Sequence, residues 1–149
     1  MVQSKPAAMT AQEINAFLDR EFPQIHRAGR IFTVEAADHG AARMRMAYHE
    51  SFLRPGGTIS GPSMFTLADL AMYAAVLSAI GPRAQAVTIN LSINFLRRPE
   101  PRDMLGEARL LRVSKRLAVG EIALHSDGEE ELAAHATATY SIPSLDRVK

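Results

Sequence analysis

Residues 61–80 read GPSMFTLADLAMYAAVLSAI, and this long apolar segment decides the fold. Pro62 suits the first turn of a helix, where the N–H group that proline lacks would have no partner. Gly81 and Pro82 follow the segment and end the helix. Because apolar residues occur on every side, the pattern predicts a buried core helix, and the charge at Asp69 argues against a membrane span.

Strand patterns surround this predicted helix on both sides. Alternating residues predict an antiparallel hairpin over residues 31–36 and 42–48, with its turn at residues 38–40. Four more strands are predicted after the helix, over residues 87–95, 104–113, 117–126 and 132–141. An antiparallel sheet needs its apolar face covered, and only the 61–80 helix is apolar enough for that role. We therefore predict an α+β fold in which a curled antiparallel sheet wraps around one long central helix.

A capping box marks the first helix of the chain. Thr10 and Glu13 supply it, and the apolar residues behind them predict a short amphipathic helix that ends near Pro23. Residues 1–9 are small and polar, and we expect them to be mobile. Since 149 residues is a usual size for one domain, we expect residues 10–149 to form a single domain.

The composition excludes several classes of function. The chain has no cysteine, which excludes a disulfide scaffold, a thiolate nucleophile and a cysteine metal site. Its 17 Lys and Arg balance 16 Asp and Glu, so the net charge gives no signal for nucleic acid or an anionic membrane. The five histidines lack metal-type spacing, and we expect no metal. Residues 1–10 lack the apolar stretch of a signal peptide, so we expect a cytoplasmic protein.

Asp69 is the only charged residue between Thr58 and Pro82. A lone carboxylate in such a segment must be desolvated, paired, exposed at a subunit interface or lining a cavity. A place in a cavity would be the functional role. Composition alone leaves a purely structural role open.

The start of the core helix is the second candidate feature. Ser60 and Gly61 are predicted to present free backbone N–H groups at the helix N-terminus, where they could stabilise a developing negative charge. Asp69 lies about 12 Å further along the helix axis, so within one chain the two features cannot contact the same atom. A site shared between two chains would remove this difficulty.

The clearest strand pattern directly follows the helix. Its apolar face is predicted to carry Val87, Ile89, Leu91, Ile93 and Phe95, and its polar face Thr88, Asn90, Ser92 and Asn94.

Two stretches carry a resemblance to a known family. Residues 60–69 read SGPSMFTLAD, and residues 90–99 read NLSINFLRRP. They resemble the hotdog-fold acyl-CoA thioesterases of the phenylacetate-pathway type. The resemblance implies a hotdog fold, a thioester hydrolase and a small-molecule acyl-CoA substrate. It implies a homo-oligomer with shared active sites, a dimer or a dimer of dimers (homotetramer), and neither nucleic acid nor membrane as a partner. No cofactor is implied, since coenzyme A is part of the substrate.

The resemblance also implies roles for individual residues. Asp69 corresponds to the family's helix carboxylate, which acts as general base or nucleophile. Gly61 corresponds to the N–H group that polarises the thioester carbonyl, and in the family's dimers these two groups come from opposite subunits. Thr88 corresponds to a hydroxyl that helps to place the attacking water.

The turn before the helix departs from the family pattern. Many members have His-Gly-Gly where this chain has Ser60-Gly61-Pro62, and an asparagine where it has Arg54. Pro62 cannot donate a hydrogen bond, so Gly61 and Ser63 are the predicted donors.

Several polar residues are candidates for holding the substrate and its coenzyme A part. Guanidinium groups suit bidentate contact with phosphate, although solvated charges at strand ends are the alternative for each cation. The candidates are Arg54, Ser60, Ser63, Asn90, Arg97, Arg98, Lys115 and Arg116.

Two alternatives to thioester hydrolysis stay open. The altered turn favours a non-catalytic hotdog protein that binds acyl-CoA or only oligomerises. A hotdog dehydratase is weakened because no histidine lies in the helix or the loop before it to partner the carboxylate.

Overall fold

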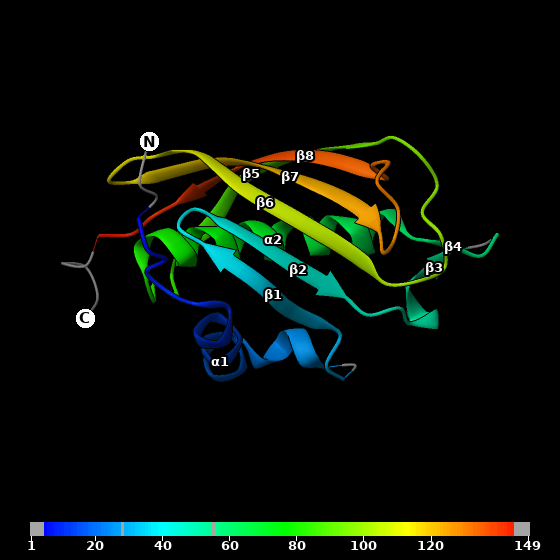
Figure 1. Ribbon diagram of the computed structural model, residues 1–149, viewed down its shortest axis with the longest axis horizontal. Coiled ribbons are helices and arrows are strands. Elements are labelled where there is room, and N and C mark those ends of the chain that lie inside the picture. The colour runs from blue at the N-terminus through cyan, green and yellow to red at the C-terminus, as the bar shows by residue number, and fades with distance from the viewer. Residues whose placement is uncertain (1–4, 28, 55, 145–149) are drawn as a thin grey trace.

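The computed structural model describes residues 5–27, 29–54 and 56–144, in which a curled antiparallel sheet wraps around one long helix (Figure 1). The helices are α1 (Ala11–Glu21) and α2 (Gly61–Ile80), with short 3₁₀ turns at Pro23–His26 and Glu50–Phe52. The strands are β1 (Phe32–Asp38), β2 (Ala41–Met46), β3 (Leu53–Arg54), β4 (Thr58–Ile59), β5 (Val87–Phe95), β6 (Met104–Val113), β7 (Leu117–Ser126) and β8 (Ala134–Ser141).

Six strands form the main sheet in the order β1-β2-β6-β7-β8-β5, and all neighbouring pairs are antiparallel. The helix α2 runs along one face of this sheet, and α1 lies beside β1 (Figure 1). The short strands β3 and β4 pair with each other just before α2. This arrangement confirms the predicted α+β hotdog fold, and it leaves β5 at one edge of the sheet.

The helix α2 is the core of the molecule. Ser60 caps its start, where the Ser60 side chain accepts a hydrogen bond from the Ser63 N–H group over 3.3 Å. Gly81 ends it with a φ of 85°, a left-handed value that favours glycine. By length and composition α2 could cross a membrane, yet 67% of its most apolar stretch is buried inside the protein. The prediction of a buried core helix is confirmed.

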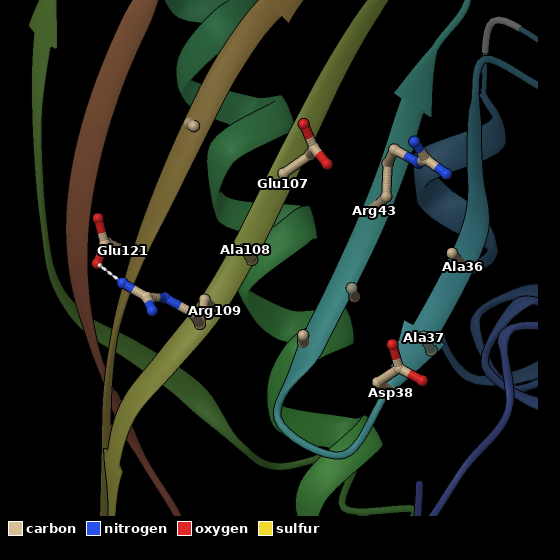
Figure 2. A pocket seen from close by; sticks show the side chains of 11 residues that line it. Ala36, Ala37, Asp38, Arg43, Glu107, Ala108, Arg109 and Glu121 are labelled. Atoms are coloured by element: carbon tan, nitrogen blue, oxygen red, sulfur yellow. Dashed lines mark hydrogen bonds and ion pairs between the residues drawn. The ribbon is translucent and has the colours of Figure 1, made fainter. Parts of the chain in front are cut away.

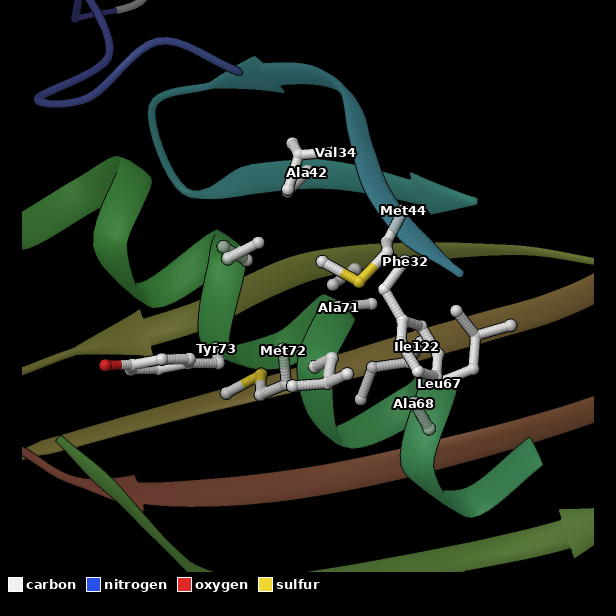
Figure 3. Packing of buried hydrophobic residues seen from close by; sticks show 14 of the residues in the cluster. Phe32, Val34, Ala42, Met44, Leu67, Ala68, Ala71, Met72, Tyr73 and Ile122 are labelled. Atoms are coloured by element: carbon white, nitrogen blue, oxygen red, sulfur yellow. The ribbon is translucent and has the colours of Figure 1, made fainter. Parts of the chain in front are cut away.

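Strands on both sides of the sheet centre pack against α2 (Figure 3). Met44 of β2, Leu67 of α2 and Ile122 of β7 are all fully buried in this core. Unbranched and branched apolar side chains interlock there, so the position of α2 on the sheet is fixed by packing.

Two glycines of the sheet allow α2 to lie close to it. A Cβ atom at Gly106 would lie 3.2 Å from the Leu67 side chain. A Cβ atom at Gly120 would lie 2.8 Å from Met72 Sδ and 2.9 Å from the backbone oxygen of Arg109. The sheet therefore needs glycine where α2 crosses it.

Gly120→Ala is expected to lower the free energy of unfolding by about 1–3 kcal/mol, because the contact with the Arg109 backbone cannot be relieved by rotating a side chain. Gly106→Ala meets side-chain atoms only and should cost less. Urea denaturation followed by circular dichroism measures both. A wild-type midpoint for Gly120→Ala would contradict the close approach.

The ends of the predicted elements mostly agree with the structure. The helix predicted before Pro23 is α1, and the hairpin with its turn at residues 38–40 is β1–β2. The strand predicted from residue 132 begins at Ala134. Within the N-terminal segment expected to be mobile, residues 1–4 lie outside the described residues, as do residues 145–149 of the expected domain.

Two residues of that N-terminal segment are fixed against the protein. Ala8 N–H donates to the backbone oxygen of Ser78 over 2.7 Å, and Met9 is only 6% exposed. The expectation of mobility was therefore wrong for Ala8 and Met9.

One extra residue, Ile89, interrupts the pairing of β5 with β8. Thr88 pairs with Tyr140 and Asn90 with Thr139, so Ile89 has no partner and forms a β-bulge. The bulge shifts the alternation of side chains by one residue. It turns Thr88 toward α2.

Regular alternation was thus the wrong prediction at the start of β5. Val87 and Ile89, expected on the apolar face, are 57% and 58% exposed. Leu91 and Ile93, beyond the bulge, pack against the core as predicted. The polar face was predicted correctly for Asn90 and incorrectly for Thr88.

Candidate functional site

Asp69 lies half-buried on α2, and two hydroxyl groups donate to one of its carboxylate oxygens. Thr88 Oγ1 donates to Oδ1 over 2.6 Å, and the Tyr140 hydroxyl donates to the same oxygen over 2.7 Å. Within the described part of the chain, no group donates to Oδ2. One carboxylate oxygen is thus fixed, and the other is open to a bound molecule.

Tyr140 is a residue of this site that the sequence analysis missed. It is 4% exposed, and its hydroxyl also lies 3.0 Å from the backbone oxygen of Asp69. Burial and the Asp69 charge raise the pKa of Tyr140 far above its usual value, so the hydroxyl keeps its proton and stays a donor. The sequence signal was the tyrosine in AHATATYS, a strand whose other side chains apart from His135 are small.

A second tyrosine packs against Tyr140. Tyr73 lies one turn of α2 beyond Asp69, and its ring stacks on that of Tyr140 with centroids 6.1 Å apart and an interplanar angle of 21°. The Tyr73 hydroxyl donates to the backbone oxygen of Ala84 over 3.1 Å. Burial and the Glu21 charge raise the pKa of Tyr73 to about 12.

Asp69, Thr88 and Tyr140 line one cavity of about 440 Å³. The rest of its wall comes from the end of α1, from α2 and from the segment that leads into β5. These residues are Glu21, Phe22, Gln24, Leu70, Tyr73, Ala84, Ala86 and Val87. We call it the Asp69 cavity. It presents a half-buried carboxylate beside apolar and aromatic walls.

Gly61, at the start of α2, lines a different hollow of about 520 Å³. Its N–H group has no hydrogen-bond acceptor among the described residues. Ser60 and Ser63 were also expected to present free N–H groups, but both N–H groups have acceptors. Ser60 N–H donates to the backbone oxygen of Phe52 over 2.7 Å, and Ser63 N–H donates to the Ser60 side chain. The prediction of free donors is wrong for Ser60 and Ser63, and Gly61 alone remains.

The Gly61 hollow shares no lining residue with the Asp69 cavity. This separation agrees with the axial distance expected from their spacing on the helix. Within one chain, Gly61 and Asp69 therefore cannot act on the same atom.

The structure separates the predicted cations into two groups. Arg54, Arg97 and Arg98 line the Gly61 hollow, whereas Lys115 and Arg116 line another hollow of about 380 Å³. The ten residues of β6 lie between the two groups, about 30 Å in an extended strand. One chain cannot bring both groups to one ligand.

The cations beside Gly61 differ in their partners. Arg97 forms ion pairs with Glu131 and, over 3.9 Å, with Glu129. For Arg54 and Arg98, the described residues include no ion-pair partner. Arg54 and Arg98 are therefore better placed than Arg97 to bind an anion.

Asn90, another predicted substrate contact, lies on the exposed face of β5 opposite Thr139. This face points away from α2, because the bulge separates Asn90 from Thr88. The structure does not bring Asn90 into the Asp69 cavity.

A third hollow, of about 540 Å³, lies on the outer face of β1, β2, β6 and β7 (Figure 2). Its charges are partly paired, as Arg109 contacts Glu121 over 2.8 Å. Arg109 and His135 lower the pKa of Glu121, which keeps it a carboxylate. Over residues 5–27, 29–54 and 56–144, no group of three His, Asp or Glu side chains could hold a metal ion. The Asp69 cavity is the stronger candidate for a site of chemistry.

Known proteins share both the sequence and the architecture of this chain. The sequence profile of the thioesterase superfamily matches residues 56–133, just over half of the chain. A candidate esterase of Halobacterium salinarum is 36% identical over 98 residues, which span 62% of this chain and 64% of that relative, less than two thirds of its length.

Solved structures extend the similarity over most of the chain. A candidate thioesterase from Silicibacter sp. TM1040 is 47% identical, with a TM-score of 0.85 over 95% of this chain and 97% of that one. A candidate thioesterase from Ralstonia eutropha JMP134, described as related to phenylacetic acid degradation, is 27% identical. Its TM-score is 0.68, over 74% of this chain and 84% of that one.

Proposed function

Because this chain belongs to the thioesterase superfamily, we propose that it hydrolyses acyl-CoA thioesters to a free acid and coenzyme A. The observation that carries the proposal is the state of Asp69. Its Oδ1 accepts hydrogen bonds from Thr88 and Tyr140, and its Oδ2 is free to contact a molecule bound in the cavity. A fixed carboxylate with one free oxygen suits either a general base or a nucleophile.

The reactants of the proposed chemistry are that free oxygen, water and the thioester. In one route Asp69 Oδ2 takes a proton from water while the water oxygen bonds to the acyl carbon. In the other, Oδ2 itself bonds to the acyl carbon and water later cleaves the anhydride. In both routes the C–S bond breaks, and coenzyme A leaves as a thiolate that takes up a proton. Thr88 and Tyr140 hold the carboxylate in one orientation throughout.

The negative charge that develops on the acyl oxygen needs a donor, and Gly61 supplies the free N–H group. Because Gly61 lies outside the Asp69 cavity of its own chain, we place a second chain's Gly61 at each site. The exposed edge of β5 supports this arrangement, since an unpaired edge strand can pair with another chain. Phe65 of α2 and Phe95 of β5 are 39% and 52% exposed, which adds apolar surface for such an interface.

The proposal therefore includes a homodimer, or a dimer of dimers, with sites formed by two chains. Arg54 and Arg98, beside Gly61, would bind the phosphates of coenzyme A. It also includes a cytoplasmic location.

Tyr140→Phe is expected to lower kcat about tenfold with little change in KM, because Asp69 Oδ1 loses one of its two donors. Steady-state release of thiol measures the effect. Tyr48→Phe removes the same hydroxyl from a tyrosine outside the cavity, so it should keep the wild-type kcat. A wild-type kcat for Tyr140→Phe would show that Thr88 alone orients the carboxylate.

Release of the coenzyme A thiol from short, long and aromatic acyl-CoAs tests the proposed function. We expect at least one thioester to be hydrolysed with a kcat of about 1 s⁻¹ or more. Tight binding of acyl-CoA without release of thiol from any of them would instead identify a non-catalytic acyl-CoA-binding protein.

A further inference from the structure

The Asp69 cavity extends past Tyr140 and Tyr73 to the end of α1. Asp69 and Tyr73 are one helical turn apart, about 6 Å along α2. Glu21, the last residue of α1, lines the same cavity, and its charge acts on the Tyr73 hydroxyl. Glu21 and Asp69 are thus two carboxylates in the wall of one cavity.

Part of the cavity wall is apolar. Leu70 and Ala86 are 5% and 7% exposed, and Tyr73 lines the cavity beside them. Asp69 and Glu21 are its only charged lining residues within the described chain. An acyl group that reacts at Asp69 would thus share its cavity with apolar side chains and with a second carboxylate.

Glu21 is not explained by the stability of α1. The C-terminal end of a helix carries a partial negative charge, which disfavours a carboxylate there. The one ion pair that Glu21 makes with described residues, to adjacent Arg20, is 3.9 Å long, and the Glu21 side chain is 45% exposed. The Tyr73 hydroxyl does not donate to it, because that hydroxyl donates to Ala84. Glu21 oxygens are free to accept a hydrogen bond.

We propose that Glu21 is a specificity residue that selects acyl groups ending in an uncharged hydrogen-bond donor, such as a hydroxyl, over acyl groups ending in a carboxylate. A terminal hydroxyl would donate to Glu21, whereas a terminal carboxylate would be repelled by its charge. This inference rests on the proposed function, because it takes the Asp69 cavity as the acyl site.

Three CoA thioesters of equal chain length test the selection: octanoyl, 8-hydroxyoctanoyl and 7-carboxyheptanoyl. For the wild type we expect kcat/KM for the hydroxylated thioester to exceed that for the carboxylated one at least about tenfold. Glu21→Gln should bring the ratio within about threefold, mainly by improving the carboxylated substrate. Glu130→Gln removes an equal charge from an exposed turn and should leave the wild-type ratio.

Two results would overturn the inference. If Glu21→Gln leaves the ratio unchanged in an active enzyme, Glu21 has no part in selection and the proposed function stands. If the wild type hydrolyses none of the three, the proposed function fails for this class of substrate. The affinities of the three thioesters for the wild type and for Glu21→Gln, measured by calorimetry, then test the selection. Equal affinities throughout would refute it.

Discussion

Asp69→Asn is expected to lower kcat for acyl-CoA hydrolysis about 10³-fold and to change KM only a few fold. The asparagine oxygen can still accept the hydrogen bonds that Thr88 and Tyr140 donate, so the geometry of the cavity persists. Its amide nitrogen, in the place of Oδ2, can neither take a proton from water nor bond to the acyl carbon. Release of thiol from the best substrate, followed in the steady state and in a single turnover, measures the loss.

Asp38→Asn is the matched control. Asp38 ends β1 and lines the hollow on the outer face of the sheet rather than the Asp69 cavity. Its replacement should therefore leave kcat unchanged. Thermal unfolding checks that both variants fold. If Asp69→Asn kept its rate within tenfold of the wild type, Asp69 would be a structural carboxylate, the role that composition alone leaves open.

The fold could be predicted because its signals are local. The apolar segment that forms α2 is bounded by Pro62 and Gly81, and these residues set its ends in any surroundings. The strands after it show alternation that survives in β7 and β8, whereas β6 is buried over its first three residues, exposed over its last three and shifted in register between Leu110 and Arg112. Since only one helix is apolar on all sides, its place inside the sheet followed from burial.

The partners of Asp69 could not be predicted, because they depend on strand register. Thr88 faces α2 only because Ile89 forms a bulge, and alternation by itself placed Thr88 on the opposite face. Tyr140 reaches Asp69 because β8 pairs with β5 in the register that sets it opposite Thr88. Pairing between strands far apart in the sequence leaves no local signal.

The N-cap of α2 is predictable from the sequence. A serine just before a helix is a common N-cap, and Ser60 accepts the Ser63 N–H group in this way. The loss of the Ser60 N–H group could not be foreseen, since it donates to Phe52 in a 3₁₀ turn that the sequence analysis did not predict.

The Gly61 N–H group can be removed by a substitution that the backbone accepts. Ser60 has φ −72° and ψ 152°, an extended conformation that proline tolerates in the residue before it. Proline also suits the first turn of a helix, so Gly61→Pro removes a donor where α2 has no hydrogen bond to lose. Gly61→Ala keeps the N–H group and adds a Cβ atom 3.3 Å from the Phe95 ring. Alanine is therefore the steric control for proline, which should lower kcat about 10²–10³-fold.

A mixed dimer of one Asp69→Asn chain and one Gly61→Pro chain is expected to recover about half of the wild-type activity per dimer, although each parent homodimer is nearly inactive. If each site takes Asp69 from one chain and Gly61 from the other, the mixed dimer has one intact site and one doubly altered site. Co-expression with two different affinity tags isolates it, and release of thiol measures its rate.

The same experiment separates a shared site from one built within a single chain. Sites formed by one chain would leave both halves of the mixed dimer damaged, and its activity would stay at the average of the two parents. A mixed dimer of Gly61→Ala and Asp69→Asn chains is the assembly control, since alanine keeps the N–H group and this pair should reach about half of the wild-type rate whether or not the sites are shared. Failure of the proline pair together with success of the alanine pair would mean that Gly61 and Asp69 do not meet across a subunit interface. Failure of both pairs would mean instead that the mixed dimer does not assemble in an active form.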